Sequence, residues 1–257
     1  MRTLALPALL ALAALLGGPA ALCAQAGAPQ APPVTGARQL LVVTTADWDT
    51  VPGTLRRYER AAPGAAWRPV GGPVAVVVGR SGMGWGRGLH AAGPAAGDPV
   101  KREGDGRAPA GVFRIGSAFG YASASSVRWI RVPYIHSTES FRCVDDVKSA
   151  YYNQVVDSAG VRKDWTGTVE RMRLSDDQYK LGAVVEHNWG GETRPGDGSC
   201  IFLHVWKGPA HGTAGCTAMD EASITEVLRW LDPAAAPTLV QLPRAEYAAR
   251  RAAWGLP

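Results

Sequence analysis

The sequence contains few of the residues that build metal centres: its 257 residues include only four cysteines and five histidines. No two cysteines have the Cys-x-x-Cys spacing, and the cysteines and histidines form no local cluster. Zinc sites are commonly built from such pairs and clusters. The sequence therefore indicates no metal site.

The sequence also has no run of basic residues, no basic helix and no internal repeat. The net charge is nevertheless +5, because 27 Lys and Arg residues face 22 Asp and Glu residues. A basic surface suits an anionic partner such as a cell-wall polymer or a nucleic acid. The lack of any basic run argues against a nucleic-acid partner.

A long apolar run occurs only near the N-terminus. Arg2 precedes an Ala/Leu run over residues 4–16, and the small residues around Ala24 and Ala26 fit a cleavage site. Residues 1–26 are therefore predicted to be a signal peptide, with a retained N-terminal anchor as the alternative. We expect an exported protein, periplasmic or cell-wall associated, with no transmembrane segment after cleavage.

The rest of the composition indicates a β-rich globular chain. Hydrophobic residues make up 46% of the sequence, and 31 glycines and 19 prolines favour many short strands and turns. We expect one mainly β domain with a few helices over residues 38–242, with an insertion at about 137–198. A Pro/Ala-rich linker is predicted at 27–37 and a C-terminal tail at 243–257.

Alternating and apolar patterns place the individual elements. Helices are expected at 220–231, where Asp220 is a plausible N-cap, and in the tail at 244–254. Strands are expected at 39–45, 55–60, 67–70, 74–78, 112–115, 127–132, 183–188, 200–206 and 238–242.

The most informative stretch contains His204 and Cys216. His204 interrupts an apolar strand, and Cys216 directly follows Gly215, shortly before the helix expected from Asp220. A Cys at the start of a helix gains a positive dipole that favours the thiolate. A thiolate, a nearby base and backbone N–H donors are what nucleophilic Cys catalysis needs. The alternative is a small buried Cys beside a core His.

Two segments resemble the L,D-transpeptidases, which have a YkuD-like catalytic domain. His204, the glycine-bearing turn and residues 213–219 (Thr-Ala-Gly-Cys-Thr-Ala-Met) resemble that family's His, spacer and Ser/Thr-His-Gly-Cys signature. Residues 104–113 resemble its upstream Gly-x-x-x-x-Pro-x-Gly-x-Phe/Tyr segment. The resemblance covers about 73–242. Papain-like peptidoglycan endopeptidases have the opposite order, with Cys before His.

The chain departs from the family at Ala214, where His is usual, and at Ala218, where Arg is usual. It therefore resembles a divergent branch. The resemblance implies a β-sandwich-like fold and acyl transfer on peptidoglycan stem peptides. It makes Cys216 the nucleophile, His204 the base and acid, and the Gly215 backbone part of the oxyanion site. No metal or organic cofactor is needed.

Five further residues are candidates for binding the substrate. They are His187 and Asn188 at the end of an expected strand, Thr213 in the signature, Trp206 and Tyr152. His187 has plain packing as its alternative.

Signal cleavage leaves Cys143, Cys200 and Cys216. A nucleophile locked in a disulfide could not attack, so we predict a bond between Cys143 and Cys200 and a free Cys216. Three free thiols remain the alternative.

Two other functions stay open. The same thioester chemistry would serve an L,D-carboxypeptidase or amidase, in which water replaces an amine acceptor. A chain with a vestigial Cys would instead be a non-catalytic cell-wall-binding module.

Overall fold

β-strands make up most of the regular structure in the computed structural model, which describes residues 31–90, 93–167 and 169–257. Only two α-helices occur in these residues, so the mainly β expectation is confirmed. The predicted signal peptide lies outside the described residues. The strands are β1 Gln39–Thr45, β2 Pro52–Glu59, β3 Arg68–Val77, β4 Met83–Trp85, β5 Ala108–Gly120, β6 Tyr134–His136, β7 Phe141–Cys143, β8 Val155–Asp157, β9 Glu170–Arg171, β10 Leu181–Val185, β11 Phe202–Val205, β12 Thr217–Met219 and β13 Thr238–Pro243; the helices are α1 Glu221–Trp230 and α2 Arg244–Trp254.

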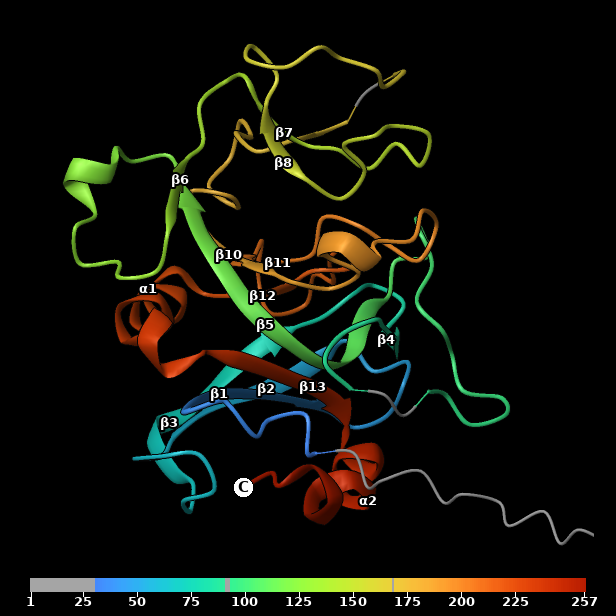
Figure 1. The fold of residues 1–257 in the computed structure, drawn as a ribbon, viewed down its shortest axis with the longest axis vertical. Helices are drawn as coiled ribbons and strands as arrows, with labels where there is room; N and C mark the ends of the chain where they lie inside the picture. The colour runs from blue at the N-terminus through green and yellow to red at the C-terminus, as the bar shows by residue number, and fades with distance from the viewer. Residues whose placement is uncertain (1–30, 91–92, 168) are drawn as a thin grey trace, which may run out of the picture. The chain divides into compact units, whose positions relative to one another are not determined.

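The main sheet closes on itself. Its strand order is β10-β11-β12-β3-β2-β1-β13-β5-β4, β6 adds to β5, and β10 also pairs with β5 (Figure 1). The pairs β1–β13 and β11–β12 are parallel. This pairing forms one continuous path and does not divide the strands into two stacked sheets.

β1 lies deep in this sheet because its sequence is apolar on both faces. Leu40, Leu41, Val42 and Val43 are all buried. A strand covered on both faces reads as a continuous apolar run instead of an alternating one. β1 pairs with β2 on one side and with β13 on the other, as such a central strand should.

Helix α1 begins and packs as the sequence predicts. The Asp220 side chain accepts a hydrogen bond from the backbone N–H of Ser223, which makes Asp220 the N-cap. Ile224, Val227 and Leu228 are buried on one face, and the helix contacts β10 and β11. Among the described residues, no helix is both long enough and apolar enough to cross a bilayer.

The predicted tail helix is present and packs on the sheet. Trp254 is buried at the end of α2, and the helix contacts β13 and β1. The described part of the predicted linker packs there too. Arg60 donates hydrogen bonds to the carbonyls of Val34 and Ala37, and both residues are buried.

Two strand predictions are wrong. Residues 127–132 form no strand; Ile130 N–H closes a turn onto the Val127 carbonyl, and the apolar side chains enter the core from a loop. Residues 67–70 and 74–78 belong to one strand, β3, although Pro73 lies inside it. β3 has only β2 as a neighbour at that point, and an edge strand tolerates a proline.

The segment predicted as an insertion divides into two parts. β7, β8 and β9 form a separate three-stranded sheet in the order β8-β7-β9, whereas β10 belongs to the main sheet (Figure 1). A disulfide joins Cys143 in β7 to Cys200 just before β11, the pair proposed from the sequence, and Cys216 is free and buried. The bond therefore ties the small sheet to the main one.

Replacing both Cys143 and Cys200 by Ser should lower the free energy of unfolding. The bond closes a loop of 57 residues, for which the chain-entropy model gives at most about 4 kcal/mol. Denaturant unfolding of the oxidised protein and the double variant measures the difference. Non-reducing peptide mapping that finds Cys216 in a bridge would contradict the pairing.

Candidate active site around Cys216

Two neighbouring parallel strands bring His204 and Cys216 together. In the β11–β12 register, Leu203 is opposite Thr217, and Cys216 directly precedes Thr217. The Phe202 N–H lies 3.3 Å from Cys216 Sγ and donates a hydrogen bond to it. His204 and Cys216 both line one cavity of about 400 Å³, called here the Cys216 cavity. Its other lining residues are Lys101, Glu103, Gly104, Asp145, Glu170, Leu174, Gln178, Tyr179, Ser199, Cys200, Ile201, Lys207, Gly212, Thr213, Ala214 and Gly215.

The expectation that Cys216 sits at the start of a helix is wrong. Strand β12 follows Cys216, and α1 begins only at Glu221. Thr217 to Met219 pair with β11 and β3 as a buried strand, too short to show a period in the sequence. Burial, and next the charge of Glu170, raise the pKa of the Cys216 thiol above its ordinary value. The resting group is therefore a thiol.

His204 is buried and held in one tautomer. Its Nδ1 lies 2.8 Å from the Val205 carbonyl oxygen, which can only accept a hydrogen bond. Nδ1 therefore carries the proton. The Gln178 backbone is a second hydrogen-bonding partner of the ring, and both partners oppose the lowering of the pKa by burial. Burial lowers the pKa of His204 to about 4, so the imidazole is neutral at pH 7. A neutral imidazole is able to accept a proton from a thiol.

Tyr179 and Glu170 were not singled out by the sequence. The Tyr179 ring meets the His204 ring edge-on, with centroids 5.1 Å apart. Its hydroxyl donates to the Glu170 carboxylate and also lies within hydrogen-bonding reach of Cys216 Sγ. Burial raises the pKa of Glu170 to about 7. The surrounding sequence is polar and carries no motif, so no signal marked these residues.

Further charged groups line the cavity. Glu103 Oε2 accepts hydrogen bonds from Tyr152 Oη at 2.5 Å and from Ser199 Oγ at 2.7 Å. Burial raises the pKa of Asp145, and the Glu103 charge adds to this. Lys101 Nζ forms an ion pair with Asp105 at 2.6 Å. In the part of the chain that the structure describes, no three His, Cys, Asp or Glu side chains are grouped as metal ligands.

Thr213 and Gly215 lie beside Cys216, and hydrogen bonds of Thr213 Oγ1 join the three residues. Thr213 Oγ1 donates to the Cys216 carbonyl at 2.6 Å and accepts from the Gly215 N–H at 3.1 Å. The Gly215 N–H is thus occupied. For the N–H of Cys216 itself, no hydrogen-bond acceptor is found within the described ranges. Of these two backbone donors, the Cys216 N–H is thus the one without a partner in the described ranges.

His187 and Asn188 do not line the Cys216 cavity. His187 Nδ1 accepts from the Arg87 N–H, its Nε2 lies 3.0 Å from the Asp197 carbonyl, and burial lowers its pKa to about 3. The Asn188 side chain bonds Arg194 and the Gly198 carbonyl. Both residues anchor the loop before Cys200, so their expected role in substrate binding is not supported.

Trp206 and Tyr152 are not part of the cavity wall either. Trp206 follows β11, and its N–H bonds the Met219 carbonyl. Tyr152 is buried and acts on the cavity indirectly, through its hydrogen bond to Glu103. Of the five predicted binding residues, only Thr213 contacts the cavity directly.

The two segments that resemble one family lie side by side although they are far apart in the chain. Gly104 lines the cavity, and a Cβ on Gly215 would be 3.0 Å from the Arg107 carbonyl oxygen. The buried Gln241 side chain accepts from Thr217 Oγ1 and donates to the Pro109 carbonyl. This bridge fixes β12 against the beginning of β5.

Replacing Glu170 by Gln should change how stability depends on pH. The pKa of Glu170 is about 7 in the folded chain against an ordinary 4.5, so the unfolded chain ionises first. The wild type should therefore lose stability relative to the variant as pH rises from 4.5 to 7, by at most about 1.4 kcal/mol per pH unit.

Chemical denaturation at several pH values measures this difference. Glu192→Gln, at an exposed position, is the matched control and should follow the wild-type curve. The buried histidines act in the opposite direction and cancel in the comparison, because both proteins retain them. Parallel curves for the wild type and Glu170→Gln would contradict the assignment.

Comparison with known proteins gives no relative. No protein-family model matches the chain, and neither a curated protein nor a solved structure matches it. What the site does therefore has to be argued from its own residues.

Proposed function

We propose that this chain is a divergent L,D-transpeptidase-type enzyme, exported to the periplasm or cell wall, which transfers acyl groups of peptidoglycan stem peptides through a Cys216 thioester. The observation that carries the proposal is the shared cavity of Cys216 and His204, formed by the adjacent strands β11 and β12. The contact with residues 104–113 supports it. The closed sheet is then a variant of that family's β-sandwich-like domain.

The first half of the reaction starts from two neutral groups. As Cys216 Sγ attacks the carbonyl carbon before a D-amino acid, its proton passes to His204 Nε2. The free N–H of Cys216 stabilises the oxyanion that forms. His204 then donates the proton to the departing amine, and the amide bond breaks to leave a thioester. Cys216 and His204 are charged only while the step takes place. The resting buried site therefore holds no ionised thiolate or imidazolium.

The second half regenerates the enzyme. An amine acceptor gives up a proton to His204 Nε2 and attacks the thioester, which releases Cys216 as a thiol and forms a cross-link. Water in place of the amine gives the L,D-carboxypeptidase alternative. The product formed with and without an added amine distinguishes the two activities.

Lys101 compensates in this proposal for the arginine that the family has where this chain has Ala218. Ala218 is fully buried, opposite His204 in the sheet, whereas Lys101 lies in the cavity wall. A Cβ on Gly215 would lie 3.8 Å from Lys101 Cε, so the lysine passes close to the nucleophile. Its Nζ is paired with Asp105 at 2.6 Å, so a stem-peptide carboxylate would compete with this aspartate for the lysine.

The binding-module alternative makes a different prediction about covalent chemistry. Reactivity toward a thiol reagent does not separate it from the enzyme, because burial raises the pKa of Cys216 in either case. An acyl adduct on Cys216 does separate them. Mass spectrometry of the protein mixed with isolated stem peptides should find this adduct, and its absence together with unchanged peptides would favour the module.

Cys216→Ser and His204→Gln should each lower kcat/KM on stem peptides by at least about 10³-fold. The serine is nearly isosteric, so the folded state should lose only about 1 kcal/mol. Product analysis by mass spectrometry gives the rates, and thermal unfolding checks the fold.

The matched control is His211→Gln. His211 is exposed in the turn after β11 and does not line the Cys216 cavity. Its replacement should leave the rate within about twofold. Turnover by Cys216→Ser close to the wild-type rate would overturn the mechanism, and equal losses for His211 and His204 would overturn the choice of base.

A further inference from the structure

We propose that a second site, remote from Cys216, binds a linear polymer that carries one phosphate per repeat and no bases. The site is a groove of about 1380 Å³ between helix α2 and the face of the sheet formed by β1 and β2, called here the α2 groove. It shares no residue with the Cys216 cavity. Its lining residues are Pro32, Val34, Thr35, Val42, Thr44, Thr54, Arg56, Tyr58, Arg60, Gly64, Ala65, Ala66, Trp67, Arg244, Tyr247, Ala248, Arg251, Ala252, Trp254, Gly255, Leu256 and Pro257.

Four arginines line the groove and no Asp or Glu side chain does. Arg56, Arg60, Arg244 and Arg251 form no ion pair with any residue that the structure describes. The side chains that line the groove therefore carry a net positive charge, which favours an anion.

Three of the arginines face the groove because of the spacing of side chains along strand β2 and helix α2. Alternate residues of β2 face the groove, which places Arg56 beside Thr54 and Tyr58. On α2, Arg244, Tyr247 and Arg251 recur at helical spacing and share the face toward the sheet. The sequence thus places positive charge on both walls.

Arg60 is the buried member of the four arginines. It donates to the backbone carbonyls of Val34, Thr35 and Ala37, which do not neutralise it. Its guanidinium also lies over the Trp67 ring, 4.1 Å from the centroid. A guanidinium held in place by neutral groups keeps its positive charge, which adds to the charge of the groove.

Four aromatic residues line the groove, and three of them, Tyr58, Trp67 and Tyr247, pack partly buried against the core. One face of Trp67 carries Arg60, and its Nε1 donates to the Gly255 carbonyl. Tyr247 bonds the Pro257 carbonyl, and Trp254 is buried. A single-stranded nucleic acid needs open ring faces for its bases. The arginines lie along a groove between α2 and the sheet, and a flat membrane surface does not follow both walls. An extended polyol-phosphate chain fits these constraints.

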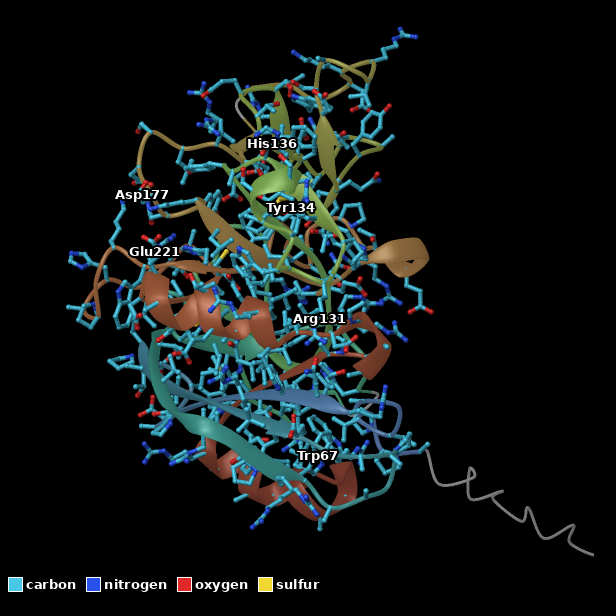
Figure 2. All side chains as sticks on the ribbon, turned by 90° about the vertical axis from the view of Figure 1, so that its left-hand side faces the viewer. Trp67, Arg131, Tyr134, His136, Asp177 and Glu221 are labelled. Carbon is cyan, nitrogen blue, oxygen red and sulfur yellow. A yellow bond between two sulfur atoms is a disulfide. The ribbon has the colours of Figure 1, made fainter. Side chains whose placement is uncertain are left out.

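The groove lies at a different part of the described domain from the Cys216 cavity. Figure 1 shows α2 beyond β1 and β13, whereas the small sheet that borders the cavity lies at the other end, above β10 to β12. Figure 2 labels Trp67 near α2, and Tyr134 and His136 of β6 toward the small sheet. A polymer in the groove would leave the cavity open.

The test compares two triple variants of equal charge. Arg56→Ala, Arg244→Ala and Arg251→Ala together remove three exposed charges from the groove. Arg128→Ala, Arg162→Ala and Lys163→Ala remove three exposed charges elsewhere. Binding of a glycerol-phosphate polymer to the full chain is measured by titration calorimetry across several salt concentrations, with thermal unfolding as the check on folding.

The groove variant should bind at least about tenfold more weakly, and the slope of log K against log salt should fall by about 2, since each lost phosphate contact removes about 0.7–0.9. The control variant should stay within about twofold of the wild type. Equal losses in both variants, or none in either, would overturn the site. Tighter binding to single-stranded DNA of equal charge or to anionic vesicles would overturn the ligand class.

Discussion

The parallel pairing of β11 with β12 is the constraint on which the candidate site depends. A parallel pair needs a crossover, and here the crossover is the connection from Trp206 to Cys216. This connection returns the chain to the same end of the sheet. His204 in β11 and Cys216 before β12 therefore line one cavity. A slip of one residue would move Cys216 to the other face.

Burial sets the electrostatic state of this site more than any single charge does. An ionised thiolate and imidazolium would lose much hydration in the interior, so both groups remain neutral. The hydrogen bonds that fix them, from the Phe202 N–H to the sulfur and from His204 Nδ1 to the Val205 carbonyl, need no ionisation. Both side chains are therefore positioned without the desolvation free energy that a buried ion pair would require.

Structural features that depend on neighbouring residues could be predicted from the sequence, whereas features that depend on tertiary contacts could not. The apolar run of β1 and the N-cap at Asp220 were readable because neighbouring residues determine them. Residues 127–132 look like a strand, yet their apolar side chains fill the core from a loop. The place of Tyr179 beside Cys216, and the anchoring role of His187, depend on the closure of the sheet, which no local period records.

Three cysteine sulfur atoms lie in one buried cluster: those of the disulfide between Cys143 and Cys200, and that of Cys216. Cys216 is close enough to Cys200 to donate to its carbonyl, and it also accepts from the Phe202 N–H. A bond between Cys200 and Cys216 would consume the thiol that the proposed reaction uses and would leave Cys143 unpaired. Pairing of Cys143 with Cys200 therefore preserves that thiol as well as joining the two sheets.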